Sequence, residues 1–140
     1  MQQGKDTITI FLVEDNVVDV MGVQRAFRKS EFSNHIVVAS DGLQALDKLR
    51  DGQSVPRPYL ILLDLNMPRM NGLEFLREIR GDNTLKDSIV FVLTTSNAPD
   101  DRKSAYEKNI AGYILKGGET NGFVNVAGLL DHYASVCELP

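Results

Sequence analysis

The chain has 140 residues, of which 43% are hydrophobic and 24% are charged, and its formal net charge is −4 at pH 7. This balance is typical of a soluble globular domain, and without a basic stripe it argues against nucleic acid as a partner. No apolar run is long enough to span a bilayer, the polar start "MQQGKDT" lacks a signal-peptide pattern, and the single cysteine, Cys137, cannot form an internal disulfide. We therefore expect residues 1–140 to form one cytoplasmic domain that does not associate with membranes.

Short apolar runs rich in β-branched residues recur along the chain and are predicted as strands at 8–13, 36–39, 59–63, 89–93 and 112–115. A segment of helical character follows each run. Strand and helix thus alternate five times, which predicts an α/β fold with a parallel sheet and helices on both of its faces. The segment 50–58 is the most loop-like, and it only joins a helix to a strand.

The segments between the strands are predicted as helices at 17–30, 41–50, 72–80 and 98–109, with a last helix at 123–137. In the first helix, Val17, Met21 and Phe27 are expected on one side. The last helix carries apolar residues at alternating spacings of three and four, which is typical of an amphipathic helix: Phe123, Val126, Leu130, Tyr133 and Cys137.

Polar side chains follow four of the predicted strands at their carboxyl ends. Glu14 and Asp15 come after the first strand and Asp64 after the third, while Thr94 and Lys116 follow the fourth and fifth. All strands of an open parallel sheet point the same way, and ligands of such folds bind at the carboxyl edge. We therefore expect three acids, a hydroxyl and a lysine to meet at one edge of the sheet.

This group of side chains has the parts needed for phosphoryl transfer. Clustered carboxylates without histidine or cysteine favour a hard cation such as Mg²⁺, and a carboxylate such as Asp64 can be the nucleophile that forms an aspartyl phosphate. Lys116 would supply a positive charge and Thr94 a hydrogen-bond donor for the phosphoryl oxygens. Each group taken alone has an ordinary structural explanation, and only their joint occurrence favours a functional site.

The motifs "FLVEDN", "LILLDLNMPRMNG", "VFVLTT" and "GYILK" resemble those of the receiver domain of bacterial two-component response regulators. The resemblance covers essentially the whole chain, from Ile8 to the final helix. It implies a CheY-like fold, with five parallel strands in the order 2-1-3-4-5. It also implies a single receiver domain over 1–140 without an output domain, so that the signal leaves through contact with a downstream protein.

The resemblance further implies a role for each group at the strand ends. Asp64 would accept a phosphoryl group from a sensor histidine kinase, Thr94 would move toward that group, and Lys116 would pair with it. Tyr113 matches the aromatic residue whose burial reports the switch. The implied ligands of Mg²⁺ (or Mn²⁺) are Glu14, Asp15, Asp64 and the backbone carbonyl of Asn66.

A narrower likeness links the chain to small single-domain regulators that serve phytochrome-type kinases, through "PRPYLILLDLNMPRMNG", "LTTSN" and a glycine after Lys116.

Two positions depart from the usual receiver. Gly117 and Gly118 replace a proline, so the loop should be more mobile or should adopt positive φ. Thr95 replaces a smaller residue and should restrict access of water or small phosphodonors.

The final helix is more apolar than packing against a sheet requires, and we expect some of its apolar surface to stay exposed in a monomer. A two-fold homodimer would cover it, as in the phytochrome-associated regulators that this chain resembles. The interface is expected at Phe123, Val126, Leu130 and Tyr133. The alternative is that Leu129 and Val136 simply lie at the boundary of the core.

Two other functions remain open from the residues. One is a small phosphatase or phosphotransferase with an aspartyl-phosphate intermediate, but such enzymes need a second acid where this chain has Asn66. The other is a receiver-like adaptor that has lost phosphorylation, although Asp15, Asp64 and Lys116 are all present. A nucleotide-binding loop is excluded because no GxGxxG or GxxxxGK[ST] motif follows a strand. We expect a signalling protein that catalyses only its own phosphorylation and dephosphorylation.

Overall fold

The computed structural model describes residues 8–28 and 35–140. Its elements are β1 (Thr9–Val13), α1 (Val17–Arg28), β2 (His35–Ala39), α2 (Gly42–Arg50), β3 (Tyr59–Leu63), α3 (Gly72–Arg80), β4 (Ile89–Thr94), α4 (Pro99–Glu107), β5 (Gly112–Leu115) and α5 (Val124–Val136). The strands pair in parallel in the order β2-β1-β3-β4-β5. The predicted fold is therefore confirmed. The last two residues of the predicted 17–30 helix lie outside the described residues.

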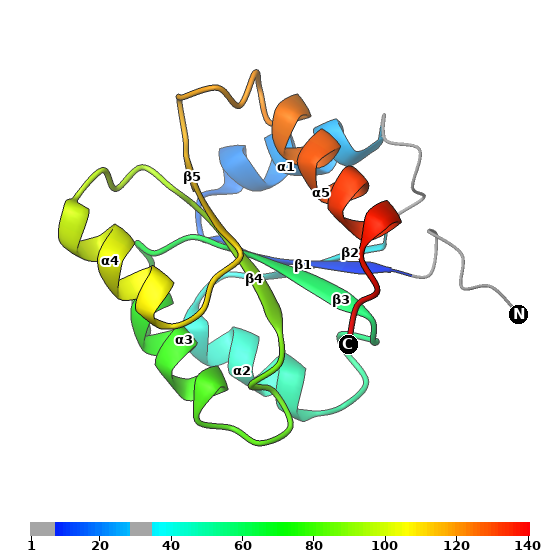
Figure 1. The fold of residues 1–140 in the computed structure, drawn as a ribbon, viewed down its shortest axis with the longest axis vertical. Helices are drawn as coiled ribbons and strands as arrows, with labels where there is room; N and C mark the ends of the chain where they lie inside the picture. The colour runs from blue at the N-terminus through cyan, green and yellow to red at the C-terminus, as the bar shows by residue number, and fades with distance from the viewer. Residues whose placement is uncertain (1–7, 29–34) are drawn as a thin grey trace, which may run out of the picture.

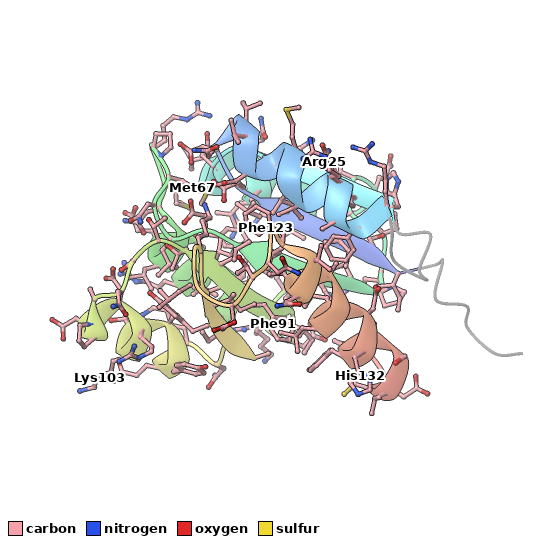
Figure 2. All side chains as sticks on the ribbon, turned by 90° about the horizontal axis from the view of Figure 1, so that it is seen from above. Arg25, Met67, Phe91, Lys103, Phe123 and His132 are labelled. Atoms are coloured by element: carbon pink, nitrogen blue, oxygen red, sulfur yellow. The ribbon has the colours of Figure 1, made fainter. Side chains whose placement is uncertain are left out.

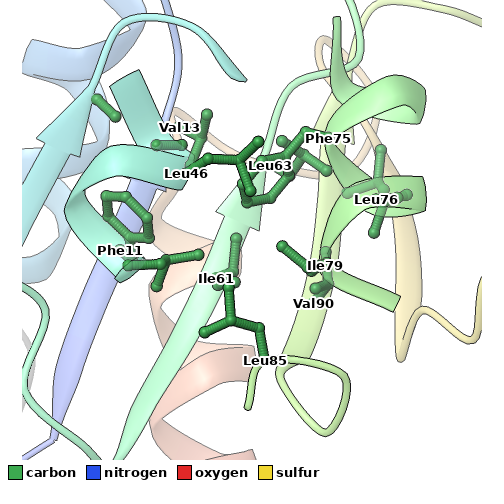
Figure 3. Packing of buried hydrophobic residues seen from close by; sticks show 14 of the residues in the cluster. Phe11, Val13, Leu46, Ile61, Leu63, Phe75, Leu76, Ile79, Leu85 and Val90 are labelled. Carbon is green, nitrogen blue, oxygen red and sulfur yellow. The ribbon is translucent and has the colours of Figure 1, made fainter. Parts of the chain in front are cut away.

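The helices form a layer on each face of the sheet, with α2, α3 and α4 on one face and α1 and α5 on the other (Figure 1). Successive residues of a strand point to opposite faces. Accordingly, Phe11 and Ile61 pack with α2 and α3, as Figure 3 shows, while Leu12 and Leu62 pack with α1 and α5. Because both faces are covered, β1 and β3 are buried along their whole length, and their carboxyl ends are held rigidly.

Helix α3 begins directly against the chain that leaves β3. The side chain of its N-cap residue, Asn71, accepts a hydrogen bond from the backbone N–H of Glu74, and the Glu74 side chain accepts one from Asn71 in return. A Cβ atom on the first helical residue, Gly72, would lie 2.5 Å from the backbone oxygen of Asp64. Only glycine allows this approach, which fixes the start of α3 beside the end of β3.

The first turn of α1 does not pack as predicted. The buried residues of α1 are Val23, Ala26 and Phe27, whereas Val17 and Met21 are exposed. The prediction that placed Val17 and Met21 on the same side as Phe27 was wrong. This turn lies at the carboxyl edge of the sheet, just after β1 ends, so the strands do not cover it.

Of the four residues predicted for an interface, two are buried in the core and two are half-buried. Val126 and Leu130 are only 2% and 1% exposed and belong to the core. The Tyr133 ring contacts Phe91 edge-on, with centroids 5.2 Å apart. Phe123 lies between α1 and α5 (Figure 2), where a Cβ atom on Gly22 would come within 2.9 Å of its ring. Val126 and Leu130 are part of the core, so their assignment to an exposed interface is corrected. Phe123 and Tyr133 are only half-buried, and their place in an interface stays a prediction.

Other apolar residues of α5 face outward instead: Val124, Leu129 and Val136. Leu129 is 44% exposed and Val136 69% exposed. They are seven residues apart, so they lie on the same side of the helix. The expected surplus of exposed apolar surface on α5 is therefore present. Within residues 8–28 and 35–140, no helix is both long enough and apolar enough to cross a membrane.

Candidate functional site

Three carboxylates meet at the carboxyl edge of the sheet. Glu14 and Asp15 follow β1, Asp64 follows β3, and these two strands are direct neighbours. One oxygen atom from each carboxylate lies within 4.8 Å of the other two. Glu14 and Asp64 are buried, at 2% and 6% exposure, while Asp15 is exposed. The cluster is thus open to solvent on one side.

Backbone hydrogen bonds extend the sheet into the cluster and orient its acids. The N–H of Glu14 donates to the Ala39 carbonyl (2.9 Å), and the N–H of Asp64 donates to the Val13 carbonyl (3.0 Å). The Asn66 N–H donates to Asp64 Oδ1 at 3.2 Å. The other oxygen, Asp64 Oδ2, therefore remains directed at Lys116.

The Lys116 ammonium joins the acids from the end of β5. Its Nζ atom lies 2.6 Å from Glu14 Oε1, 2.8 Å from Asp19 Oδ2 and 3.4 Å from Asp64 Oδ2. Its backbone N–H donates to the Thr94 carbonyl (2.8 Å). Sequence reasoning missed Asp19. The available signal was its position four residues after Asp15, in the first turn of the helix that follows the first strand.

Burial and neighbouring charges change the protonation of this site. Burial raises the pKa of Glu14 to about 7, although hydrogen bonds from Lys116 and the Asn16 N–H oppose the rise. The nearby Asp64 carboxylate adds to the rise. Burial alone would lower the pKa of Lys116, but hydrogen bonds to Asp19 and Glu14 raise it above its ordinary value. The lysine is therefore a permanent cation within a group of acids.

Thr94 and Tyr113 both contact Ser96, in the loop that follows β4. Thr94 is fully buried, and its Oγ1 accepts a hydrogen bond from the Ser96 N–H at 3.3 Å. The half-buried Tyr113 donates from its hydroxyl to the Ser96 carbonyl at 2.9 Å. The Ser96 hydroxyl in turn donates to Asp101 of α4, 2.5 Å away. Ser96, which the sequence did not single out, connects both predicted switch residues to α4.

The loop after Asp64 is fastened to the start of α2. Arg69, whose φ is +65°, pairs with the buried carboxylate of Asp41. Burial tends to raise the pKa of Asp41, but hydrogen bonds from the Gln44 N–H and Arg69 lower it below its ordinary value. The Gly42 N–H also donates to the Met70 carbonyl (3.0 Å). These contacts hold the loop that carries Asn66.

An open cleft of about 400 Å³ lies beside this loop, lined by Leu65, Asn66, Met67, Asn71, Leu73 and Asp101.

At the other side of the site, Gly117 has a φ of +78°. Of the two outcomes expected from the missing proline, positive φ is therefore confirmed. Thr95 is exposed, and its effect on access to the site stays a prediction.

The acid cluster fits a divalent cation. Its three acidic side chains offer carboxylate oxygens, no histidine or cysteine joins them within the described residues, and one of the three acids is open to solvent. The role of the Asn66 backbone carbonyl as a further ligand stays a prediction. Hard cations such as Mg²⁺ and Mn²⁺ prefer oxygen ligands of this kind and keep some coordinated water. Glu14, Asp15 and Asp64 could hold such an ion, with Lys116 at the boundary of the cluster.

Comparisons with known proteins agree with this geometry. The profile of the response regulator receiver domain matches residues 10–127. The response regulator Rcp1 of Synechocystis sp. is 36% identical over 135 residues, which is 94% of this chain and 92% of Rcp1. The probable methanogenesis regulatory protein FilR2 of Methanothrix harundinacea is 39% identical over 118 residues, or 81% of this chain and 75% of FilR2.

Solved structures extend the likeness to three dimensions. The phosphorylated cyanobacterial phytochrome response regulator RcpA superposes with a TM-score of 0.85 at 38% identity, covering 94% of this chain and 97% of RcpA. The Mn²⁺-bound form of Rcp1 has a TM-score of 0.83 at 36% identity and covers 94% of this chain and 98% of Rcp1.

Proposed function

Because the chain belongs to the family of response regulator receiver domains, we propose that it accepts a phosphoryl group on Asp64 from a histidine kinase. The observation that carries this proposal is the placement of the Asp64 carboxylate. It is buried, it shares a cluster with Glu14 and Asp15, and its Oδ2 atom lies 3.4 Å from a lysine ammonium.

In the proposed reaction, an Asp64 oxygen attacks the phosphorus of a phosphohistidine, and the new O–P bond replaces the P–N bond. The electron pair of the broken bond returns to the imidazole nitrogen. Lys116 donates to the phosphoryl oxygens, and Thr94 adds a hydroxyl donor once it moves toward them. Glu14, Asp15 and Asp64 would hold a Mg²⁺ ion, which would supply positive charge to offset the charge of the phosphoryl group.

The relatives support a narrower version of the proposal. Rcp1 and RcpA are similar over 94% of this chain, and RcpA is a phytochrome response regulator. We therefore assign a phytochrome-type kinase as the phosphodonor and a protein as the downstream partner. Rcp1 also binds Mn²⁺, which supports Mg²⁺ or Mn²⁺ as the cofactor of this chain.

A phosphotransfer assay tests the kinase assignment. A phytochrome-type histidine kinase, labelled by its own autophosphorylation, is mixed with the chain in Mg²⁺, and the label on each protein is followed in time. Label should move to the wild type and to Asp47→Asn, an exposed acid on α2, but not to Asp64→Asn. A kinase of another input class should transfer more slowly. Equal transfer to Asp64→Asn would contradict the proposed acceptor.

We also propose that the chain forms a homodimer through the exposed side of α5. Leu129 and Val136 are apolar, exposed and on the same side of the helix, and burying them against a second copy would remove that surface from water. Sedimentation at micromolar concentration should give a dimer that Leu129→Asp weakens. Leu43→Asp, at an equally exposed leucine of α2 on the other face of the sheet, is the control. A monomeric wild type would contradict this part of the proposal.

A further inference from the structure

The Lys116 ammonium is shared among three carboxylates, and these have different positions relative to the proposed cation site. Glu14 and Asp64 belong to the cluster that would hold the ion. Asp19, at 2.8 Å, does not belong to it. Among the Lys116 acceptors in the described part of the chain, Asp19 alone draws the ammonium away from the cluster.

Asp19 is held firmly at the first turn of α1. Its backbone N–H donates to Asn16 Oδ1 at 3.0 Å, and the Val20 N–H donates to the Asn16 carbonyl at 3.0 Å. The Asn16 N–H itself donates to Glu14 Oε2 at 3.1 Å. One residue therefore fixes both Asp19 and Glu14, and the positive end of the helix dipole favours a carboxylate at this turn.

The Lys116 backbone is held by its hydrogen bond to the Thr94 carbonyl, whereas the end of its long side chain is placed by these three acceptors. Gly117 and Gly118 follow the lysine, and a Cβ atom on Gly117 would meet no atom within 4 Å. A side chain at position 117 would therefore project into open space. The ammonium itself is well buried, since the lysine side chain is only 9% exposed. Its position thus depends on the balance of charge around it.

We infer that Asp19 is a positioning residue for Lys116, which keeps the ammonium at the boundary of the acid cluster and leaves space for a divalent cation. Without the Asp19 charge, the ammonium would move toward Glu14 and Asp64 and would compete with the cation for their oxygens. The inference rests on the proposed function, because the cation site is part of that proposal.

A double-mutant cycle on cation affinity separates this role from a general effect of charge. Mg²⁺ is titrated by calorimetry into the wild type, Asp19→Asn, Lys116→Ala and the double variant. Asp19→Asn should lower the affinity at least about threefold when Lys116 is present, and clearly less in the Lys116→Ala background, as expected for residues in contact. Asp100→Asn removes an acid from the first turn of α4 and should change neither.

The lysine itself gives a second readout. In the cation-free protein, the side-chain NMR signal of Lys116 should shift in Asp19→Asn and stay unchanged in Asp100→Asn. An equal loss of Mg²⁺ affinity in both backgrounds, or an unshifted Lys116 signal, would overturn the inference while leaving the proposed function intact. A wild type that binds no Mg²⁺ would overturn the proposed cation site, and the inference with it.

Discussion

The Tyr113 hydroxyl donates a hydrogen bond to the backbone carbonyl of Ser96, 2.9 Å away. The N–H of the same residue, Ser96, donates to Thr94 Oγ1 at 3.3 Å. A movement of Thr94 toward a phosphoryl group on Asp64 would break the second bond and displace the loop that holds the first. The proposed phosphorylation of Asp64 would then affect Tyr113 through Ser96, as a shift between two arrangements of one loop.

Removing the Tyr113 hydroxyl should favour the phosphorylated arrangement. Tyr113→Phe takes one hydrogen bond of about 1 kcal/mol from the resting loop. Beryllofluoride, a mimic of the phosphoryl group, should consequently bind roughly fivefold more tightly. Tyr106→Phe, at an exposed tyrosine of α4, should leave its affinity unchanged. If both variants bind like the wild type, Tyr113 does not hold the resting state through Ser96.

The raised pKa of Glu14 predicts a dependence of stability on pH. Its pKa is about 7 in the folded protein against an ordinary value of 4.5. Between these values the folded chain binds more protons than the unfolded chain, so the Glu14 contribution to the free energy of unfolding falls as pH rises through this window. Urea unfolding in EDTA at about pH 5 and about pH 8 measures the fall.

Glu14→Gln is the control for this measurement, because glutamine does not titrate. It should remove the part of the pH dependence that belongs to Glu14. Added Mg²⁺ should restore stability at the higher pH in the wild type, since the cation binds the ionised acid. An identical pH profile for wild type and Glu14→Gln would show that Glu14 titrates in its ordinary range.

Arg80 should be important for stability at the opposite edge of the sheet. Its guanidinium donates to four backbone carbonyls, those of Lys108 (2.7 Å), Lys86 (2.8 Å), Ser88 (2.8 Å) and Asn109 (3.1 Å). A lysine cannot reproduce this set, so Arg80→Lys should cost about 2–4 kcal/mol. Urea unfolding would measure the loss. Arg77→Lys, on the exposed side of α3, should cost little, and equal effects would refute the assignment.

Two glycines should respond to alanine in opposite directions. At Gly72 a Cβ atom would lie 2.5 Å from the Asp64 carbonyl oxygen. The clash is with backbone and not with a flexible side chain, so neither chain segment can easily move to relieve it. Gly72→Ala should cost about 2 kcal/mol or more and slow phosphorylation of Asp64. Gly128, inside α5, has no atom within 4 Å of such a Cβ, so Gly128→Ala should stabilise the protein by about 0.5–1 kcal/mol. A stable Gly72→Ala protein with normal phosphorylation would contradict the first expectation.

The strands were predictable from the sequence because a parallel sheet covered on both faces needs continuous apolar runs. Each predicted run matches its strand to within one residue at either end. The cluster of Glu14, Asp15 and Asp64 was equally predictable, since the strand ends had to meet at one edge. These features follow from local composition and from the topology that it implies.

Other features depend on how the helices and strands pack against one another, which the pattern of residue types along the chain does not specify. Leu129 and Leu130 are adjacent and chemically identical, yet the first is exposed and the second buried, because the rotation of α5 on the sheet separates them. The Asp19–Lys116 contact joins residues 97 apart in the chain, so it requires the start of α1 and the end of β5 to meet at the carboxyl edge of the sheet. The four acceptors of Arg80 are backbone carbonyls. Every residue has such a carbonyl, so residue types do not predict these contacts.

Asp64 is proposed to accept the phosphoryl group with the help of a bound cation, and one measurement tests this role most directly. The chain is incubated with phosphoramidate and Mg²⁺, weighed intact by mass spectrometry, and then fragmented to locate the modification. We expect one added phosphoryl group on Asp64, and none when EDTA is present or when Asp64→Asn is used. A full phosphoryl group on Asp64→Asn, or uptake that EDTA does not change, would contradict the claim.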